Sequence, residues 1–486
     1  MHSPGRVIVG GGLVLIGLAS VAAFDSIAGW FLTLSADADM HRYSLLQIRI
    51  MLAALLPVGL VVWGYAGIAY WLRRIQRPVM KTPERRFLIC WLLAAVGLRL
   101  VSLLLFDIPL TSDAFDYHTL AAEWVRHGCY CVEGLPTAYR PVGYPAILAA
   151  IYAIAGVAPL AGALFNLIPG VAICLLGYLL AKQWLSHATA RVSLMILVLL
   201  PSVILWTNLL MSELWFTALL LAAVLCGTMR QVQWVASGGI LLGLAALVRP
   251  IAVFVPVPMI AFWWLQQRSL PKTAIRIGAV VLLMVAVTWP WMNRNAREVG
   301  GFTLTTSTGV NLYIGNHPGA SVGYQTPDPD LFDLSDPRRE SVNDSLGTAL
   351  ALEHISSHPN EFITRGLGKI AWLFAYDAEP LREHLVNSSG ARRGLLEVLA
   401  MLVQAFYLLL WLAALGGMWR LAIGRDWLAL SLPLLLVLYW SAVHFVFFGG
   451  GRFHTPLLPF LAFLAAVWTT RNWVDKPQKR RPSHSS

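Results

Sequence analysis

Charge is the first thing that this sequence lacks. Only 13% of its 486 residues are charged, where about 25% is usual in soluble domains, and 57% are hydrophobic. The mean hydropathy is +0.65. Apolar runs near or above the ~18 residues that suggest a bilayer span occur repeatedly. These observations exclude an ordinary soluble domain and predict an all-α polytopic membrane protein.

Several catalytic signatures are also missing. The sequence contains no H-E-x-x-H motif, no Walker phosphate loop, no G-x-S-x-G elbow and no paired C-x-x-C motifs. It therefore gives no support to a zinc protease, a nucleotide-driven pump or an α/β-hydrolase. There is also no repeat with a period of about 20–50 residues and no clear inverted repeat, which weakens the case for a secondary transporter.

Cysteine is scarce, with five residues in the whole chain. Cys90, Cys174 and Cys226 lie within apolar runs, where a thiol behaves as a small hydrophobic group. Cys129 and Cys131 form a C-x-C pair in a polar stretch, which suits either a ligand pair or a disulfide. Because so short a ring is strained and no second pair lies nearby, we expect no metal or redox function here.

Apolar runs are what the sequence has in abundance. We expect twelve of them to span the membrane, at residues 7–34, 44–72, 87–106, 158–183, 189–208, 211–229, 232–248, 251–267, 274–293, 394–419, 427–447 and 453–472. No small-residue cleavage pattern follows the first run, so we expect it to be retained. The run 144–156 is only thirteen residues long and is flanked by prolines, so we expect it to be interfacial or re-entrant.

We interpret the basic residues behind the net charge of +11 as signals of membrane topology and not of nucleic-acid binding. Basic residues lie in the short connections between apolar runs, as the positive-inside rule expects. The basic cluster from Arg73 to Arg86 marks one connection as cytoplasmic, so the polar stretch 107–145 falls on the opposite side. The same reasoning places residues 295–392 outside as well.

This topology divides the chain into five parts. They are two N-terminal transmembrane helices at 1–74, a membrane core with a catalytic outer loop (107–145) at 75–294, an extracytoplasmic domain at 295–392, C-terminal transmembrane helices at 393–473 and a basic cytoplasmic tail at 474–486. The extracytoplasmic domain begins with Gly/Thr/Ser-rich sequence that favours strand and loop, and Glu340 to Phe374 is amphipathic. We therefore expect a small mixed α/β domain together with extracytoplasmic juxtamembrane helices.

A polar island interrupts this apolar chain between residues 111 and 145. Asp113, Asp116 and Tyr117 recur at helical spacing, so a helix here presents two carboxylates and a phenol on one face. Arg140 follows about 24 residues later, after a Gly/Pro-marked turn. We therefore expect the chemistry of the protein to lie in this stretch.

Other candidate residues lie at the outer ends of the apolar runs or in the polar island. The candidate substrate-binding residues are Tyr117, Arg140, Tyr144, Glu213, Arg249, Arg294, Arg452 and His454. Guanidinium groups hold phosphate and a carboxylate accepts a proton from a hydroxyl, so this set suits an anionic lipid-linked substrate. Plain alternatives exist, because an outer arginine often only anchors a headgroup, and Glu213 can cap the helix that begins at Ser212.

Seven short motifs follow one another in order. They are Asp113-Ala-Phe-Asp116-Tyr117, Arg140-Pro-Val-Gly-Tyr-Pro145, Ser212-Glu213, Gly-Leu-Ala-Ala-Leu-Val-Arg249-Pro250, Pro290-Trp-Met-Asn-Arg294-Asn, Gly315-Asn316-His-Pro and Arg452-Phe-His-Thr-Pro456. The set resembles that of integral-membrane glycosyltransferases with the GT-C fold, in the protein O-mannosyltransferase-like group that includes bacterial lipid A aminoarabinose transferases. The resemblance runs from Leu98 to Trp468 and leaves the first two apolar runs outside.

The resemblance implies transfer of a sugar from a polyprenyl-phosphate carrier to an acceptor on the extracytoplasmic side. It implies that Asp113 is the catalytic aspartate and Asp116 its neighbour, and that Arg140 and Arg249 bind the carrier phosphate. It also implies direct displacement with inversion at the anomeric carbon.

The sequence departs from the group at two places. Val142 stands where many relatives have a second proline, and Ala138-Tyr139 replace an acid that some aminoarabinose transferases carry. These departures weaken the inference of a metal site and of lipid A as the acceptor. We therefore assign no definite cofactor, and a divalent cation remains an open alternative.

The expected function is that of a hexosyl- or pentosyltransferase in a bacterial inner membrane, with its active site facing the periplasm. Its partners would be a polyprenyl-phosphate-linked sugar donor, membrane lipids and a lipid or glycan acceptor of the cell envelope, with no nucleic acid. A protein acceptor is the less favoured choice. Two alternatives stay open. A polymerase or ligase of lipid-linked glycans needs a similar basic cavity, and a lipid-linked sugar transporter or flippase would favour charges at broken helices in mid-membrane.

Overall fold

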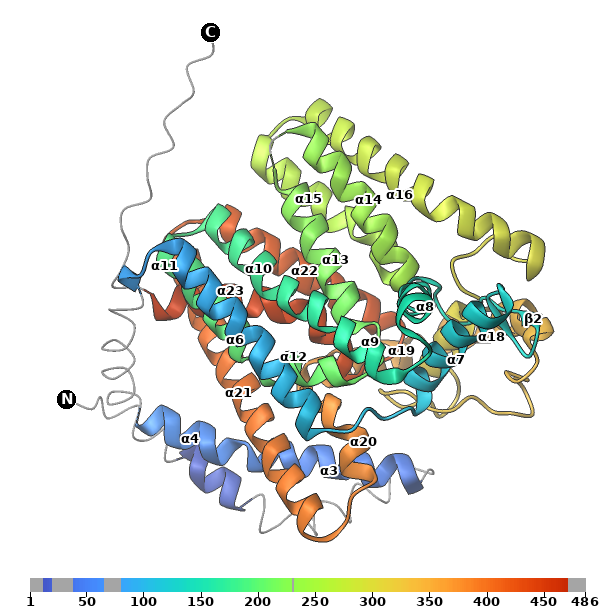
Figure 1. Cartoon of the computed structure of the whole chain (residues 1–486), viewed down its shortest axis with the longest axis horizontal. Helices are drawn as coiled ribbons and strands as arrows, with labels where there is room; N and C mark the ends of the chain where they lie inside the picture. Colours follow the sequence, from blue (N-terminus) through green and yellow to red (C-terminus); the bar gives the residue numbers. More distant parts are fainter. Residues whose placement is uncertain (1–11, 20–37, 65–79, 230, 471–486) are drawn as a thin grey trace.

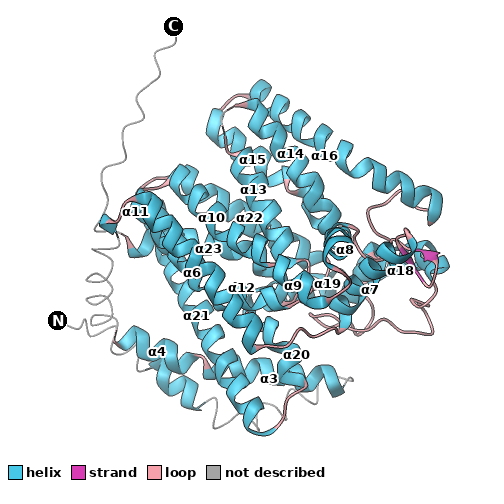
Figure 2. Ribbon diagram, in the orientation of Figure 1, coloured by secondary structure: helices cyan, strands magenta, loops and turns pink. Residues whose placement is uncertain are grey.

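The chain folds almost entirely into helices in the computed structural model (Figures 1 and 2). The structure describes residues 12–19, 38–64, 80–229 and 231–470. Over these residues the one sheet is an antiparallel hairpin of β1 (Cys131–Val132) and β2 (Leu135–Pro136). The expected all-α architecture is therefore confirmed.

Seven helical segments in the described part of the chain are long and apolar enough to cross a membrane. They are Ser44–Trp63, which joins α3 (Ala38–Ala53) and α4 (Leu55–Trp63); α6 (Glu84–Leu105); Pro159–Trp184, which joins α9 (Pro159–Phe165) and α10 (Leu167–Trp184); Pro250–Gln267, which joins η2 (Pro250–Phe254) and α15 (Pro256–Gln267); α16 (Leu270–Glu298); α21 (Gly390–Ile423); and α22 (Trp427–Val446). The chain is therefore an integral membrane protein.

The remaining expected spans are bent or short. Helix α11 (His187–Leu199) is followed after a 53° bend by α12 (Pro201–Leu205) and η1 (Trp206–Asn208), which together make an eighth candidate. The others are α13 (Glu213–Gly227), α14 (Val232–Val248) and α23 (Leu458–Thr469), of 15, 17 and 12 residues. At 1.5 Å per residue they reach about 18–26 Å, short of the ~30 Å hydrocarbon core.

The described residues therefore contain seven or eight helical segments that are long and apolar enough to span the membrane, where about twelve spans were expected for the whole chain. Prolines account for part of the difference, because Pro201 and Pro250 begin new helices inside or at the edge of apolar runs. The expected span 7–34 is described only at residues 12–19, and the basic connection at 65–79 and the tail after residue 470 lie outside the described residues.

The short apolar run after the polar island forms helix α8 (Gly143–Ala155), which has 13 residues and spans about 20 Å. It packs against α14 and against α7 (Ser112–His127), whose first turn carries Asp113. Its buried face includes Tyr144, Leu148 and Tyr152. Figure 1 shows α8 beside α7 and at one end of the long helices. Its length matches the expectation that this run does not cross the membrane.

The segment from 295 to 392 is described in full and contains helices and loops without a strand. Its elements are α17 (Thr308–Gly315), η3 (Pro337–Arg339), α18 (Glu340–Ser357), α19 (Pro359–Ala375), η4 (Glu379–Leu381) and α20 (Arg382–Val386). The amphipathic stretch predicted from Glu340 to Phe374 becomes α18 and α19, divided before Pro359.

The strands expected at the start of this segment do not form. The backbone N–H of Thr306 donates to the carbonyl of Ala138 at 3.0 Å, and the Thr305 hydroxyl donates to the carbonyl of Tyr139 at 2.7 Å. These contacts tie the segment to the loop before Arg140 without building a ladder. The mixed α/β character is thus weak, and the hairpin that provides it lies in the polar stretch 107–145.

Small residues let the last helices approach closely. A Cβ at Gly417 of α21 would overlap the backbone carbonyl of Leu464 in α23. Residues Leu458 to Ala466 of α23 are all buried. This packing fixes α23 and the 3-10 helix before it, η5 (Gly451–Leu457), which carries Arg452.

Candidate active site

Helix α7 carries the two predicted carboxylates. It begins after Thr111 and ends at Gly128, which adopts a left-handed φ of 70°. Ser112, directly before Asp113, has a φ of 50°, an uncommon conformation for a residue with a Cβ. The helix buries Asp113 and Tyr117, as expected of one face, whereas Asp116 is half-buried.

Asp113 lies between two arginines that are distant in sequence. Its Oδ1 is 2.7 Å from Nη2 of Arg140, and its Oδ2 accepts a hydrogen bond of 2.6 Å from Nη1 of Arg452. Only 8% of Asp113 is exposed. Charge-assisted hydrogen bonds of this kind are stronger than neutral ones, and both carboxylate oxygens are occupied.

Asp116 holds the same arginine from its other edge. Nε and Nη2 of Arg140 donate to Oδ2 of Asp116 at 2.9 and 2.7 Å. Arg140 therefore bridges the two carboxylates of α7, which the predicted helical spacing places one turn apart. Asp116 thus orients the Arg140 guanidinium toward Asp113.

Arg249 forms a second ion pair near the first. Its Nη2 donates to the carboxylate of Glu213, which is fully buried at the start of α13, and its Nε donates to the Ser212 hydroxyl at 2.9 Å. The Ser212-Glu213 and Arg249-Pro250 motifs thus meet directly. An unpaired charge so deeply buried would be costly, so each group stabilises the other.

The positive and negative charges of this cluster balance. Three arginines (Arg140, Arg249 and Arg452) contact three carboxylates (Asp113, Asp116 and Glu213). We call these six residues the charge cluster. A bound anion has to replace one of the carboxylates as a partner of an arginine, because no guanidinium in the cluster lacks one.

The arginines also control the acidity of Asp113. Burial acts to raise the pKa of its carboxyl, but the charges of Arg452 and Arg140 outweigh burial and hold the pKa well below its ordinary value. Asp113 is therefore ionised at neutral pH and is a weak base while both arginines contact it. Giving one arginine another anionic partner makes Asp113 more basic.

A cavity of about 1590 Å³ opens beside the charge cluster. Five of the predicted site residues line it, namely Asp113, Tyr117, Arg140, Arg249 and Arg452. Its walls come from α3, α7, η2, α15, the segment 305–326, the end of α22 and residues 447–456. The structure thus brings together side chains from the polar stretch 107–145, the middle of the chain and the C-terminal helices.

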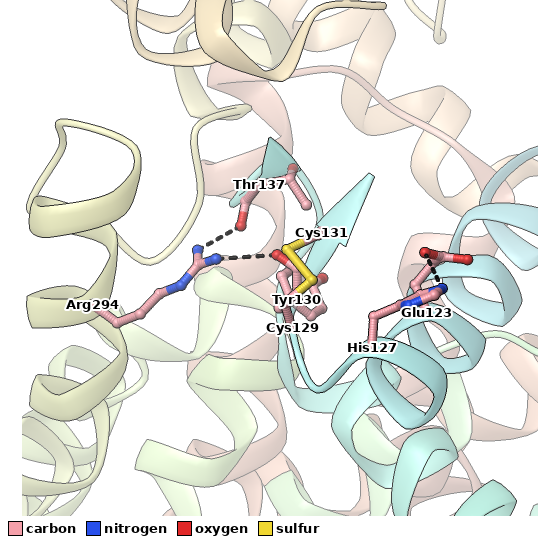
Figure 3. Close-up of a disulfide and its surroundings, with 7 residues drawn as sticks. All are labelled: Glu123, His127, Cys129, Tyr130, Cys131, Thr137 and Arg294. Atoms are coloured by element: carbon pink, nitrogen blue, oxygen red, sulfur yellow. Dashed lines mark hydrogen bonds and ion pairs between the residues drawn. A yellow bond between two sulfur atoms is a disulfide. The ribbon is translucent and has the colours of Figure 1, made fainter. Parts of the chain in front are cut away.

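Arg294 lies elsewhere, although it was expected to line the cavity. Its Nη1 donates to the carbonyl of Thr137 at 2.7 Å and its Nη2 to that of Tyr130 at 3.0 Å. Figure 3 shows it reaching across to the hairpin, beside the disulfide that joins Cys129 and Cys131. Arg294 therefore supports the loop that leads to Arg140.

Tyr144 and His454 are also placed outside the cavity lining. Tyr144 is fully buried and packs edge-to-face on Tyr117 at 5.2 Å between ring centroids. His454 is buried, with Nδ1 2.7 Å from the carbonyl of Leu373 and Nε2 2.9 Å from Oδ1 of Asp377. Glu213 and Asp116 belong to the charge cluster but likewise do not line the cavity.

The cavity has lining residues that the sequence did not single out. Tyr139, Trp372 and Tyr439 contribute aromatic surface, and Gln47 contributes an amide from α3. Tyr139 stood next to Arg140 in the motif, which was a usable signal. The others lie in apolar or amphipathic helices, where nothing in a single sequence separates them from residues that face lipid.

A metal ion has little to bind to in the described residues, which contain no group of three or more His, Cys, Asp or Glu side chains placed to hold one. The carboxylate oxygens of Asp113 already face two guanidinium groups. A divalent cation at this position would have to compete with them.

The middle of the chain is similar to one protein family. Residues 139–291 match the model of the dolichyl-phosphate-mannose-protein mannosyltransferases. No curated protein sequence matches the chain. The matched segment includes Arg140, Glu213 and Arg249, and it begins after Asp113 and ends before Arg452.

Solved structures of similar shape include two membrane enzymes. The apo oligosaccharyltransferase of Archaeoglobus fulgidus is similar with a TM-score of 0.49 and 14% identity, over 78% of this chain and 49% of that chain. The chain thus spans about half the length of that protein. ArnT from Cupriavidus metallidurans bound to undecaprenyl phosphate is similar with a TM-score of 0.42 and 14% identity, over 78% of each chain.

The family match and the ordered motifs agree. Both include the motif that starts at Arg140 and the Arg249-Pro250 pair, and the structure places these two arginines at one cavity. Residues 139–291 are thus similar to the dolichyl-phosphate-mannose-protein mannosyltransferases, and this segment carries two of the three arginines of the charge cluster.

Proposed function

We propose that the protein transfers a sugar from a polyprenyl-phosphate carrier to a hydroxyl group of a cell-envelope lipid or glycan. The observation that carries this proposal is the position of Asp113, held between Arg140 and Arg452 at the wall of a large cavity that Arg249 also lines. The arginine guanidinium groups can bind the carrier phosphate, and the Asp113 carboxylate can accept the proton of the acceptor hydroxyl.

The carrier phosphate would take over contacts that the arginines make with Asp113. Arg452 has the simplest exchange to make, because its ion pair is with Asp113, whereas Arg140 keeps Asp116 and Arg249 keeps buried Glu213. Once Arg452 turns to the phosphate, the Asp113 carboxylate regains basicity beside the acceptor hydroxyl. Donor binding thereby prepares the base.

The transfer itself exchanges one C–O bond for another. The acceptor oxygen bonds to the anomeric carbon, the bond from that carbon to the phosphate oxygen breaks, and its electron pair stays on the phosphate. The hydroxyl proton passes to Asp113. The added charge on the phosphate is stabilised by Arg140, Arg249 and Arg452, and attack opposite to the leaving group inverts the anomeric centre.

The site belongs on the extracytoplasmic side of a bacterial inner membrane in this proposal. The positive-inside count supports this side, because it places the polar stretch 107–145 and the segment 295–392 in the same outer compartment. The parts contributed by α7, by residues 305–326 and by η5 meet at the cavity, as that arrangement requires.

The test is sugar transfer in membranes supplied with labelled polyprenyl-phosphate sugars. We expect Asp113→Asn to reduce transfer at least ~100-fold, the scale of losing a general base, and Arg140→Ala to reduce it similarly. Arg338→Ala is the control, since Arg338 is exposed and pairs with Asp336 on the surface. Full activity in Asp113→Asn would overturn the assignment.

The same membranes separate the alternatives. A donor that crosses the bilayer in proteoliposomes without formation of a new glycosidic bond would indicate a flippase. Lengthened glycans from a lipid-diphosphate donor would indicate a polymerase or ligase.

A further inference from the structure

The cavity is larger than a donor headgroup needs. Its volume of about 1590 Å³ exceeds the range of about 300–1,000 Å³ that holds most small-molecule ligands. The charge cluster accounts for one part of its wall. A second polar group, formed by Ser44 and Gln47 of α3 with Glu379 and Arg382, also lines the cavity.

Helix α3 is anchored where it borders the cavity. Leu46 and Ile50 are buried in a cluster with Tyr376, Leu381 and Leu385, so one face of the helix is fixed on the segment that follows α19. Ser44, Leu45 and Ile48 line the cavity. This N-terminal helix lies outside the region of family resemblance, yet it forms part of the candidate active site.

The second polar group is internally connected. Nε2 of Gln47 donates to Oε2 of Glu379 at 3.0 Å, and Oε1 of Glu379 is 3.7 Å from Nη1 of Arg382. Gln47 is 5% exposed and the Glu379 side chain is 14% exposed. A buried amide and carboxylate that hold each other at a cavity wall present fixed hydrogen-bonding atoms to whatever enters.

The chemistry of this wall suits a sugar. An amide, a carboxylate, a guanidinium and a hydroxyl supply both donors and acceptors, which the ring hydroxyls of a glycan can match. Trp372 lines the same cavity and offers an aromatic face on which the apolar side of a sugar ring can pack. A lipid acyl chain would gain nothing from these polar atoms and would shield them from water without hydrogen-bonding to them.

We propose that Gln47, Glu379, Arg382 and Trp372 form the acceptor subsite, and that its ligand is a hydroxyl-rich glycan headgroup. This inference rests on the proposed function, in which the charge cluster holds the donor phosphate at the other part of the cavity. The N-terminal helix α3 then determines which glycan is accepted, and Asp113 deprotonates the hydroxyl that this subsite presents.

One experiment captures the acceptor directly from the cell, whichever glycan it carries. A photoreactive benzophenone residue replaces Leu45, which lines the cavity, or Leu60 on α4, which is 54% exposed and outside the lining. After illumination of cells that contain the protein, we expect mass spectrometry to find at position 45 an adduct that contains hexose or pentose and lacks the polyprenyl phosphate of the donor, and to find none at position 60. Acyl chains in the adduct would identify a glycolipid, and their absence a free glycan.

The same capture in an Asp113→Asn background separates this inference from the function. The catalytic variant should still give the adduct, because the subsite does not depend on the base. An adduct that contains only acyl chains or a protein, or equal glycan adducts at positions 45 and 60, would overturn the acceptor subsite and leave the glycosyltransferase proposal standing.

Kinetics provide the second arm. We expect Gln47→Leu and Glu379→Gln to lower transfer to the endogenous acceptor in membranes at least ~10-fold, while purified variants bind polyprenyl phosphate as the wild type does. Arg49→Gln, on the same helix but outside the lining residues, is the matched control. Weakened polyprenyl phosphate binding, or unchanged transfer, in the Gln47 and Glu379 variants would contradict the assignment.

Discussion

Two guanidinium groups share the carboxylate of Asp113, and this has a measurable effect on pH dependence. Their charges lower its pKa, so the basic form persists when the pH falls. Replacing Arg452 by glutamine removes one of these charges and raises the pKa. We therefore expect the acid limb of the activity profile of Arg452→Gln to shift to higher pH, with transfer measured between about pH 4 and 8.

The control for this shift is Arg338→Gln, which changes the net charge equally at an exposed position whose ion pair is with Asp336. Its acid limb should stay where the wild type has it. If the acid limb of Arg452→Gln also stays in place, while its rate falls, Asp113 is not the titrating base.

The buried pair of His454 and Asp377 predicts a change in stability. Both ring nitrogens of His454 face oxygen acceptors, at 2.7 and 2.9 Å, and both residues are almost fully buried. Substituting His454 by leucine leaves the Asp377 carboxylate buried without this partner, which typically costs about 3–5 kcal/mol. We expect a clear fall in the thermal unfolding temperature of His454→Leu in detergent.

His127→Leu serves as the comparison, because the His127 side chain is 62% exposed and 3.6 Å from Glu123. Its unfolding temperature should change little. Equal unfolding temperatures for His454→Leu and the wild type would show that the buried pair does not support the fold.

At the level of residues, the sequence indicated which groups gather and missed how they pair. Asp113, Arg140, Arg249 and Arg452 were predicted to share a cavity, because the charge count put the ends of their runs on one side, and all four line it. Arg294 satisfied the same argument but turns to backbone carbonyls. The topology argument predicts on which side of the membrane a helix ends, but it does not predict which way a side chain at that end points.

At the scale of elements, the approach of α21 to α23 gives a direct test of packing. A Cβ at Gly417 overlaps the carbonyl of Leu464, so Gly417→Ala has to push the helices apart. Overpacking typically costs about 1–3 kcal/mol, and we expect Gly417→Ala to lower the unfolding temperature and the yield of folded protein.

Gly97 on α6 is the matched position, because a Cβ there meets nothing within 4 Å. We expect Gly97→Ala to keep or slightly raise the unfolding temperature, since alanine favours helix over glycine. The same loss of folded protein in both variants would mean that the close contact with α23 is not what makes Gly417→Ala unstable.

Elements with a strong local signal were predictable from the sequence. The spacing of polar residues predicted α7, the thirteen-residue run predicted α8, and the amphipathic pattern predicted α18 and α19. The strands expected after Gly300 were wrong, because tertiary hydrogen bonds to Ala138 and Tyr139 take the place of strand pairing. The role of α3 had no local signal, since contacts with residues more than 300 positions away create it.

At the scale of the whole molecule, four distant parts of the chain meet at one cavity. The α3 helix, the polar stretch 107–145, the middle of the chain around Arg249 and η5 each contribute to its wall. The family model matches only residues 139–291. In the proposed function this segment holds part of the carrier site, and the parts of the chain outside it supply specificity.

In the proposed function, the balance of three arginines against three carboxylates means that Asp113 occupies the place of the carrier phosphate until the donor binds. A free phosphate ion has to evict this carboxylate and brings no lipid chain to concentrate it at the membrane. We therefore expect inorganic phosphate to inhibit transfer at least about tenfold more weakly than polyprenyl phosphate at equal concentration. Comparable inhibition would show that the site accepts any phosphate. Between turnovers, the arginines and carboxylates of the charge cluster neutralise one another. The site then needs no ion from the surrounding water, and free anions have no unpaired arginine of the cluster to bind.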